Sequence, residues 1–421
     1  MDPTHKTGSK VEIETADGKY VGIIMERPEL ADKDHLVLKL DNGYNIGVRL
    51  DRIKSTKVLS EKREKEEYAP KKHVVDPKKP TISVLATGGT IASRVDYLTG
   101  GVHSAFTAEE LVSAVPELSE IANVKVKQVF NKFSENMEPG DWVKIAQEVY
   151  NEIKTGVSGV VITHGTDTMH YTSTALAYML QTPVPVVITG AQRSSDRGSS
   201  DAAMNLIDAA VVAANGNFGE VCIVMHGEES DSHTLIHPAA KARKMHTSRR
   251  DAFKTINSLP IGKIEGRKIE YSGRVNRPRG GEAKLDAALD ENVFLLKYHP
   301  GLKPEAVDSL VKLGFKGIVI EGTGLGHTSD KLFGSIKNAI DSGISVAMTS
   351  QTLYGRVDMN VYSTGRMLLD MGVIPCEDML PEAAYVKMMW VLGHTNDQNK
   401  VKEMMQKNYA GEISERSLVL D

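Results

Sequence analysis

The sequence is poor in cysteine, with two in 421 residues, Cys222 and Cys376, each beside apolar residues. This count excludes a disulfide framework and a cysteine-based zinc site, and a reducing compartment is the simplest one for the chain. No apolar run approaches the roughly 20 residues that a membrane-spanning helix needs. The N-terminal stretch "MDPTHKTGSKVEIE" has no apolar core, so we expect no signal peptide. A cytoplasmic protein without membrane contact is predicted.

An excess of one charge is also missing. The 51 basic and 55 acidic residues give a net charge of −4, so the overall charge does not favour nucleic-acid binding, and any RNA contact requires a local patch. The apolar share of 41% and the charged share of 25% are ordinary for a soluble globular protein. The length allows two or three domains, each with its own core.

The first 60 residues have the pattern of a small all-β domain. Short β-patterned runs such as "VEIET", "HLVLKL" and "YNIGVRL" alternate with turn signals, of which Asp17-Gly18 and Asn42-Gly43 are strong hairpin signals. Four or five short strands in this length predict a small SH3-like or Sm-like β-barrel over residues 1–60. Residues 61–80, "EKREKEEYAPKKHVVDPKKP", carry dense charge of both signs and three prolines, which predicts an exposed linker.

From Thr81 onward the pattern changes to α/β. Apolar, β-branched runs such as "TISVLATGG", "GVVITHG" and "VPVVITGA" recur, and most are followed by a glycine turn and a helical pattern. Continuous apolar strands alternating with helices predict mainly parallel sheets covered on both faces. A hairpin-like and loop-like break before Asn292 places a boundary there. The expected domains are therefore residues 81–291, carrying the site, and a smaller domain over residues 292–421.

The stretch "VLATGGTIAS" ends an apolar strand in a glycine pair flanked by threonines. It lacks the GK[ST] of a phosphate-binding P-loop and the spacing of a dinucleotide fingerprint, so a phosphate cradle is the weaker interpretation. Such a stretch is commonly only a turn. The stronger functional alternative is that Gly88 and Gly89 bring backbone N–H groups close to a reacting carbonyl and present Thr90 as a nucleophile, which needs an activating group.

Two further segments supply candidate activating groups. "VVITHGTDTMHYT" places Thr166 and Asp167 directly after another strand, where Asp167 is also positioned to cap the following helix. In "HPAAKARKMHTSRRDAF", Lys244 stands in a polar context, either as an ordinary surface lysine or as a base beside a carboxylate. Since ligand sites of parallel sheets gather at the carboxyl ends of the strands, we expect these side chains to meet there.

The segments "ATGGTIAS", "ITHGTDTMHYT" and "VITGAQRSSD" resemble the signature regions of the bacterial-type (type I/II) L-asparaginase family, from about residue 81 to near the C-terminus. The resemblance implies that Thr90 is the acyl-accepting nucleophile and that Thr166, Asp167 and Lys244 form a second triad. Lys241 and Arg243, three positions and one position before it, are the alternatives to Lys244.

The same resemblance implies four more site residues. Tyr97 in "SRVDYLTGG" corresponds to a tyrosine on a mobile loop of the family, and this loop is shorter here than in the secreted asparaginases. Ser134 corresponds to a serine that contacts the α-carboxylate of the substrate. Glu135 stands where the family often has a glutamine near the α-amino group. Gly89 is expected to contact the substrate through its backbone.

The N-terminal barrel and the segment "QTLYGRVDMNVYSTGR" resemble the D subunit family of the archaeal glutamyl-tRNA(Gln) amidotransferase rather than free asparaginases. This resemblance implies that the chain hydrolyses glutamine and passes ammonia to the E subunit of the amidotransferase. That partner uses ATP and Mg to convert Glu-tRNA(Gln) to Gln-tRNA(Gln), so the chain itself is expected to bind no cofactor and to meet tRNA(Gln) through the complex. A homodimer of this chain within a heterotetramer is also implied.

Two other functions remain to be weighed. A stand-alone cytosolic L-asparaginase needs the same catalytic residues, and assays of asparagine and glutamine hydrolysis distinguish it. A non-catalytic RNA-binding or scaffold protein would use the barrel with "SRRDAFK" and "GRVNRPRGG", which are short and lack interleaved aromatic residues. No metal-binding motif such as HExxH links the histidines of the central region, so no metal site is expected. These histidines are His164, His170, His226, His233 and His237.

Overall fold

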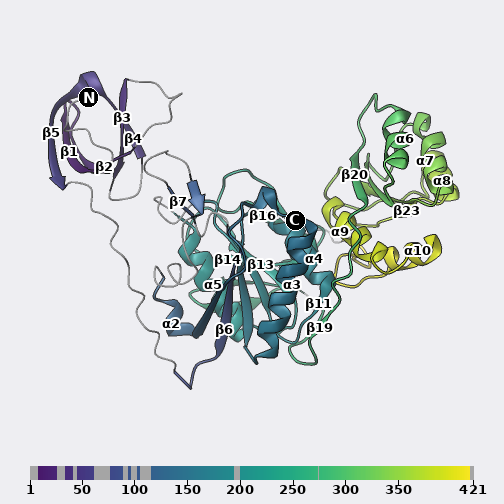
Figure 1. Cartoon of the computed structure of the whole chain (residues 1–421), viewed down its shortest axis with the longest axis horizontal. Coiled ribbons are helices and arrows are strands. Elements are labelled where there is room, and N and C mark those ends of the chain that lie inside the picture. The colour runs from purple at the N-terminus through teal and green to yellow at the C-terminus, as the bar shows by residue number, and fades with distance from the viewer. Residues whose placement is uncertain are drawn as a thin grey trace.

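The computed structural model describes residues 8–25, 34–40, 45–60, 76–88, 93–95, 102–104, 115–193, 200–273 and 275–417. These residues form an N-terminal β domain, a central domain on an eight-stranded sheet and a C-terminal domain on a four-stranded sheet. In Figure 1 the central domain lies between the other two. Among the described residues, no helix is long and apolar enough to cross a membrane.

The N-terminal domain is an antiparallel sheet of five strands in the order β4-β3-β2-β1-β5. In β1, Val11 and Ile13 are buried and their neighbours are partly exposed, as the two-residue period of a strand requires. Gly18 closes the first hairpin with a φ of +148°, and the predicted turn at Asn42-Gly43 lies outside the described residues. The strands are β1 (Lys10–Thr15), β2 (Lys19–Ile24), β3 (His35–Leu40), β4 (Asn45–Arg49) and β5 (Ile53–Ser60).

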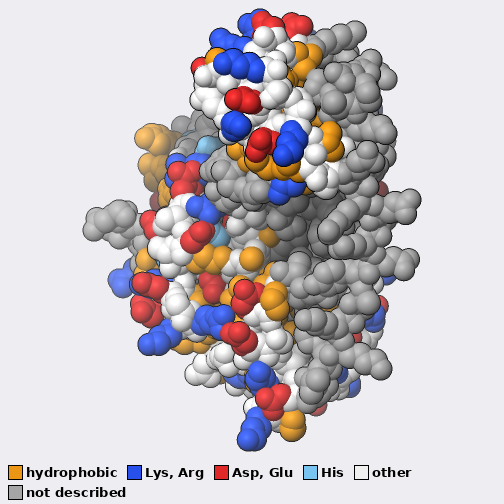
Figure 2. All heavy atoms as spheres, turned by 90° about the vertical axis from the view of Figure 1, so that its left-hand side faces the viewer, with side chains coloured by type: hydrophobic (Ala, Val, Ile, Leu, Met, Phe, Trp, Pro, Cys, Tyr) orange, Lys and Arg blue, Asp and Glu red, His pale blue; other side chains and the backbone are white. Residues whose placement is uncertain are grey.

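Charges of both signs are mixed on the described surface of this domain (Figure 2). Lys19 lies 3.8 Å from Glu14, and Arg49 pairs with Asp51 at 2.7 Å. The described part of this face therefore does not present the single-sign stripe that sequence-independent RNA binding uses.

Part of the expected linker packs against the central domain. The side-chain amide of Asn123 donates to the carbonyl oxygens of Asp76 and Lys79, and its oxygen accepts from the Asp76 N–H at 2.8 Å. Residues 76–80 are thus held beside the sheet. Residues 61–75 lie outside the described residues.

The central sheet has the order β18-β17-β14-β13-β12-β10-β6-β9. The strands from β13 to β9 are parallel, and β14, β17 and β18 continue the sheet in antiparallel pairs. Every residue of β10, β12 and β13 is buried, because helices cover both faces. The strands are β6 (Thr81–Ala86), β9 (Asn123–Gln128), β10 (Gly159–Thr163), β12 (Val186–Thr189), β13 (Val221–His226), β14 (Thr234–Pro238), β17 (Gly262–Glu265) and β18 (Lys268–Tyr271).

The two faces have separate cores. One face packs against α3 and α4, with Leu85 and Ile162 in its core, and the other packs against α2 and α5, with Val84 and Val161 in its core. A capping box formed by Glu138 and Asp141 starts α3. The helices are α2 (Leu118–Ile121), α3 (Pro139–Lys154), α4 (Met169–Met179) and α5 (Ala202–Asn215).

The C-terminal domain is built on four parallel strands in the order β20-β21-β22-β23. Its helix α9 is buried at every residue except the half-buried Tyr385, which explains why it is mostly apolar, and its two charged residues, Glu382 and Lys387, are in ion pairs. The elements are β20 (Val293–Lys297), α6 (Pro304–Lys312), β21 (Gly317–Gly322), α7 (Phe333–Asp341), β22 (Ser345–Ser350), α8 (Ser363–Met371), β23 (Ile374–Pro375), α9 (Pro381–Leu392) and α10 (Gln398–Gln406).

The two α/β domains share one core through α4 and α9. Tyr171 meets Tyr385 edge to face with ring centroids 6.3 Å apart, and Tyr178 stacks on Trp390 at 5.9 Å. The predicted α/β fold with mainly parallel sheets and a small N-terminal β domain is confirmed. Three short antiparallel pairs complete the described structure: β7 (Ser93–Val95) with β8 (Val102–Ser104), β11 (Leu180–Gln181) with β19 (Lys284–Leu285), and β15 (Ala242–Lys244) with β16 (Phe253–Thr255).

Candidate active site

The carboxyl ends of β6 and β10 lie side by side, because the strands are parallel neighbours with Ala86 opposite Thr163. Directly after β6, the Thr87 hydroxyl donates to the Thr163 carbonyl oxygen at 2.9 Å, and the Thr87 N–H donates to the same oxygen at 3.1 Å. The glycine loop and the Thr-Asp motif therefore leave the sheet from the same edge, where parallel α/β folds place their sites.

Gly88 turns the chain away from this edge. Its φ is +106°, and a Cβ at this position would lie 2.4 Å from the Lys132 carbonyl oxygen and 2.6 Å from the Lys132 nitrogen. Both the backbone angle and the space therefore require glycine. Gly89, Thr90 and Tyr97 lie outside the described residues, so their roles stay predictions.

The structure brings Thr166, Asp167 and Lys244 together. The ammonium of Lys244 donates to Thr166 Oγ1 at 2.8 Å and to Asp167 Oδ1 at 2.7 Å. Thr166 is buried, the Lys244 side chain is 10% exposed and the Asp167 side chain is 65% exposed. The alternative role of Asp167 as a helix cap does not occur, because α4 has Thr168 at its N-cap and no side-chain capping bond. The cluster is thus accessible through its carboxylate.

Of the three neighbouring cations, Lys244 is the one that contacts the Thr-Asp motif in the described part of the chain. Lys241 pairs with Asp378 at 2.7 Å, and Arg243 pairs with Glu382 at 3.0 Å. Both partners belong to the C-terminal domain. The geometry therefore favours Lys244 over its two neighbours as the lysine of the site.

Ser134 lies beside the Thr-Asp turn. The Thr168 hydroxyl donates to the Ser134 carbonyl oxygen at 2.6 Å, and a Cβ added to Gly165 would lie 2.7 Å from Ser134 Cβ. Ser134 is buried and Glu135 is exposed, both in the 3₁₀ turn η4 (Ser134–Asn136). The two predicted substrate contacts therefore come to the same edge as Lys244.

Two histidines that flank the motif are neutral packing groups. His164 is completely buried, its Nδ1 lies 2.6 Å from the Gly165 carbonyl oxygen and its Nε2 lies 3.0 Å from the Thr172 hydroxyl. Burial lowers the pKa of His164 to about 4 and that of His170 to about 3. Among the described residues, no group of three or more histidine, cysteine or acidic side chains could hold a metal ion.

A hydrogen-bonded network lies behind Thr166 and was not predicted from the sequence. The Asp201 carboxylate accepts from the backbone N–H groups of Gln192 and Arg193, and Asn205 donates to the Gly190 carbonyl oxygen at 2.9 Å. A Cβ on Gly190 would lie 3.1 Å from Thr166 Cγ2, so this network fixes the wall behind the threonine. The sequence signal for this network is the set of polar residues Asp201, Asn205 and Asp208 within the mostly apolar helical pattern "DAAMNLIDAAVVAA".

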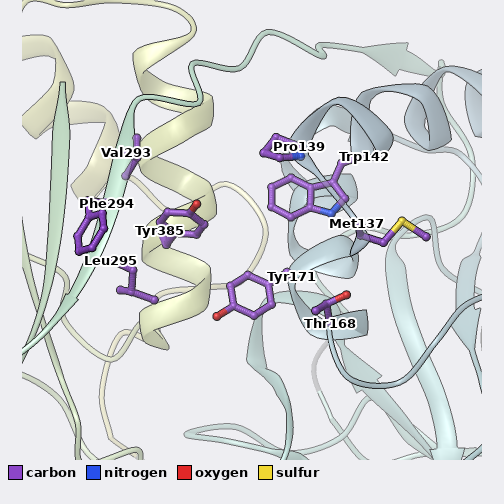
Figure 3. Close-up of a pocket in the computed structure, with 9 residues that line it drawn as sticks. All are labelled: Met137, Pro139, Trp142, Thr168, Tyr171, Val293, Phe294, Leu295 and Tyr385. Atoms are coloured by element: carbon purple, nitrogen blue, oxygen red, sulfur yellow. The ribbon is translucent and has the colours of Figure 1, made fainter. Parts of the chain in front are cut away.

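A cavity of about 460 Å³ lies between the two α/β domains, next to the Thr-Asp turn. Figure 3 shows Trp142 and Tyr171 on the central-domain side, facing Tyr385 of α9. The described lining has no charged side chain, so the cavity does not match the charged α-carboxylate and α-amino groups of an amino acid. The described residues that line it are Met137, Pro139, Trp142, Thr168, Tyr171, Val293, Phe294, Leu295 and Tyr385.

Comparisons with known proteins define the class. Residues 81–277 match the asparaginase N-terminal domain, and residues 292–405 match the glutaminase/asparaginase C-terminal domain. The thermostable L-asparaginase from Thermococcus kodakarensis has a similar structure, with a TM-score of 0.73 and 34% identity over 79% of this chain and 99% of that chain. The fold and the threonine–aspartate–lysine cluster thus define an asparaginase-type amidohydrolase.

The additional N-terminal domain distinguishes the family of this chain from that of free asparaginases. Residues 5–59 match the GatD N-terminal domain. The glutamyl-tRNA(Gln) amidotransferase D subunit of Pyrococcus furiosus is 56% identical over 97% of this chain and 92% of its own length. The D subunit of Methanothermobacter thermautotrophicus is 52% identical over 98% and 95%. The chain belongs to the D subunit family of glutamyl-tRNA(Gln) amidotransferases.

Proposed function

We propose that this chain is the glutaminase subunit of a tRNA-dependent amidotransferase, hydrolysing glutamine and supplying ammonia for the conversion of Glu-tRNA(Gln) to Gln-tRNA(Gln). Membership of the D subunit family supports the assignment. The observation that carries the chemistry is the position of Lys244, with its nitrogen 2.8 Å from Thr166 Oγ1 and 2.7 Å from Asp167 Oδ1 at the edge where the Gly88 loop begins.

The proposed reaction has two steps. Thr90 Oγ attacks the side-chain amide carbon of glutamine, and the proton of the threonine hydroxyl passes to the departing nitrogen. Ammonia is released, and the γ-glutamyl group stays bound to Thr90 as an ester. Water then attacks the ester and releases glutamate. Each step moves a proton off an oxygen nucleophile, and each develops an oxyanion that backbone N–H groups around Gly88 and Gly89 would stabilise.

Thr166, Asp167 and Lys244 serve as the proton relay in this scheme. When the lysine is neutral, its nitrogen accepts a proton from the Thr166 hydroxyl, and when it is protonated it donates to that oxygen and to the carboxylate. Ser134 and Glu135 are proposed to bind the α-carboxylate and the α-amino group, and Tyr97 to cover the site.

The remaining steps of the pathway belong to a partner. In this proposal the E subunit of the amidotransferase binds ATP and Mg, activates Glu-tRNA(Gln) and receives the ammonia, and this chain holds no cofactor of its own. The relatives are named as one subunit of an amidotransferase, which implies a complex with other subunits. A homodimer of this chain within a heterotetramer, contact with tRNA(Gln) through that complex, and a cytoplasmic location are part of the same proposal.

The catalytic assignment is tested by ammonia release from glutamine with Thr90→Ala and Lys244→Ala variants of the full chain. Both are expected to lose turnover by roughly 10³-fold or more while the fold persists, as for other nucleophiles and relay groups. Lys337→Ala, on the exposed face of α7, is the matched control with full activity. Near wild-type ammonia release from either site variant would refute the assignment.

A stand-alone L-asparaginase is the alternative function, which the similarity to the Thermococcus enzyme supports only weakly. Ammonia release from asparagine and from glutamine, measured with and without the E subunit and Glu-tRNA(Gln), separates the two. Dependence on glutamine and formation of Gln-tRNA(Gln) support the amidotransferase. Efficient asparagine hydrolysis without the partner would support the asparaginase.

A further inference from the structure

We infer that the C-terminal domain positions Lys244, through two ion pairs that hold the segment carrying it. The pairs are Lys241 with Asp378 and Arg243 with Glu382, so that Asp378 and Glu382 are positioning residues for glutamine hydrolysis. The inference rests on the proposed function, in which Lys244 is part of the relay.

The first pair is buried. Lys241 and Asp378 are each 1% exposed in their side chains, and their nitrogen and oxygen lie 2.7 Å apart. The Lys241 ammonium also donates to the Asp378 carbonyl oxygen at 3.3 Å, and the other carboxylate oxygen accepts from the Ser414 N–H at 2.9 Å. A charge so far from water needs its partner, so Lys241 is fixed relative to the C-terminal domain.

The second pair lies two residues further along. Glu382 is buried in the first turn of α9, and its Oε1 lies 3.0 Å from the Arg243 guanidinium. Burial raises the pKa of Glu382, and the charge of Arg243 opposes this rise. The second neighbour of the carboxylate, His170 at 4.0 Å, is neutral because burial lowers its pKa to about 3. Arg243 is therefore the main cationic partner of Glu382 among the described contacts.

The local structure leaves Lys244 dependent on these pairs. Strand β15 spans three residues and pairs with another three-residue strand, β16. Successive side chains of a strand point to opposite faces, so holding Arg243 against α9 turns Lys244 the other way, toward Thr166 and Asp167. Without Glu382 the charged Arg243 side chain turns toward solvent, and rotation of so short a strand moves the lysine.

The expected kinetic effect follows from geometry. A displacement of about 1 Å in a catalytic group lowers turnover by up to ~10²-fold. Because neither Asp378 nor Glu382 contacts Ser134 or Glu135 in the described structure, glutamine binding is expected to change little. The signature is a loss in kcat at an almost constant KM.

The test compares Glu382→Gln with Glu412→Gln in the full chain, assayed for glutamine hydrolysis alone and with its E subunit. The control Glu412 is also buried, and it pairs with Lys387 of the same helix rather than with Lys241 or Arg243. We expect Glu382→Gln to lower kcat at least fivefold with KM within twofold. Glu412→Gln is expected to keep kcat per folded molecule within twofold of wild type, with both populations checked by thermal unfolding.

A double-mutant cycle excludes a merely structural effect. Arg243→Gln changes the partly exposed end of the pair and is expected to lower kcat by a similar factor. In the Arg243→Gln background, Glu382→Gln should add less than twofold, because both changes break one connection. Multiplicative losses, or equal kinetics for the two glutamate variants, would overturn the inference.

The same series separates this inference from the proposed function. Full activity in Lys244→Ala would overturn the proposed site and this inference together. Loss of activity in Lys244→Ala combined with wild-type kcat in both Glu382→Gln and Arg243→Gln would overturn this inference alone.

Discussion

Replacing Gly88 by alanine should damage both the fold and the reaction, and the structure separates the two causes. The backbone φ of +106° strains any residue with a Cβ by about 1–2 kcal/mol. The added Cβ would also meet the Lys132 carbonyl oxygen at 2.4 Å, against a lower limit of 3.4 Å for ordinary contact. The backbone must therefore separate by about 1 Å, which adds about 1–3 kcal/mol of overpacking.

The matched control is Gly280→Ala. Gly280 has a φ of +115° and nothing within 4 Å of an added Cβ, so it carries the backbone strain without the contact. In urea unfolding, Gly88→Ala should lose more stability than Gly280→Ala by about 1–3 kcal/mol. In glutamine hydrolysis, Gly88→Ala should lose up to ~10² in kcat/KM, because the loop leading to Thr90 shifts. Equal stability and equal kcat/KM of the two variants would refute the reasoning.

Three further predictions concern buried ionisable groups. Lys241→Met leaves the Asp378 carboxylate buried without its cation, so the free energy of unfolding should fall by about 3–5 kcal/mol in urea denaturation. A loss below about 1 kcal/mol would contradict the description of this pair as a buried ion pair. Burial raises the pKa of Asp208 to about 6, from an unfolded value near 3.8. Between pH 4 and pH 6 the folded state therefore binds more protons at this carboxyl than the unfolded state does, and the stability of the fold decreases as the pH rises through this range. Asp208→Asn should therefore be more stable than wild type by up to about 2–3 kcal/mol at pH 7 and by little at pH 4, whereas a pH-independent difference would argue against the shift. Burial lowers the pKa of His164 to about 4, so the folded state binds fewer protons at this ring than the unfolded state does. The stability contribution of the neutral ring is therefore present above pH 6.5 and is lost as the pH falls toward 4. An NMR titration that shows protonation of this ring near pH 6.5 would contradict this prediction.

Much of the fold was predictable because its signals are local. Strands such as "GVVITHG" are apolar at every position, which requires cover on both faces, and Asp17-Gly18 specifies its hairpin without help from the rest of the chain. The Thr166-Asp167 motif was likewise found from its place after a strand. These features depend on neighbours within a few residues.

The choice among Lys241, Arg243 and Lys244 could not be made from the residues alone. It depends on the alternation of a three-residue strand and on Asp378 and Glu382, which lie more than a hundred residues away and have no motif of their own. The turn at Gly88 is similar, since its glycine is required by the distant Lys132 backbone. Thr90, Gly89 and Tyr97 lie outside the described residues and stay predictions.

The separation between Lys241 and Asp378 has a consequence during synthesis. The two residues are 137 positions apart, so a ribosome that adds ~5–20 residues per second makes Asp378 roughly 7–27 s after Lys241. During this interval the nascent central domain carries a lysine without its counter-ion beside the unfinished site. An incomplete chain, whether paused or prematurely terminated, would thus hold Lys244 less firmly and release ammonia more slowly than a molecule whose last domain has docked.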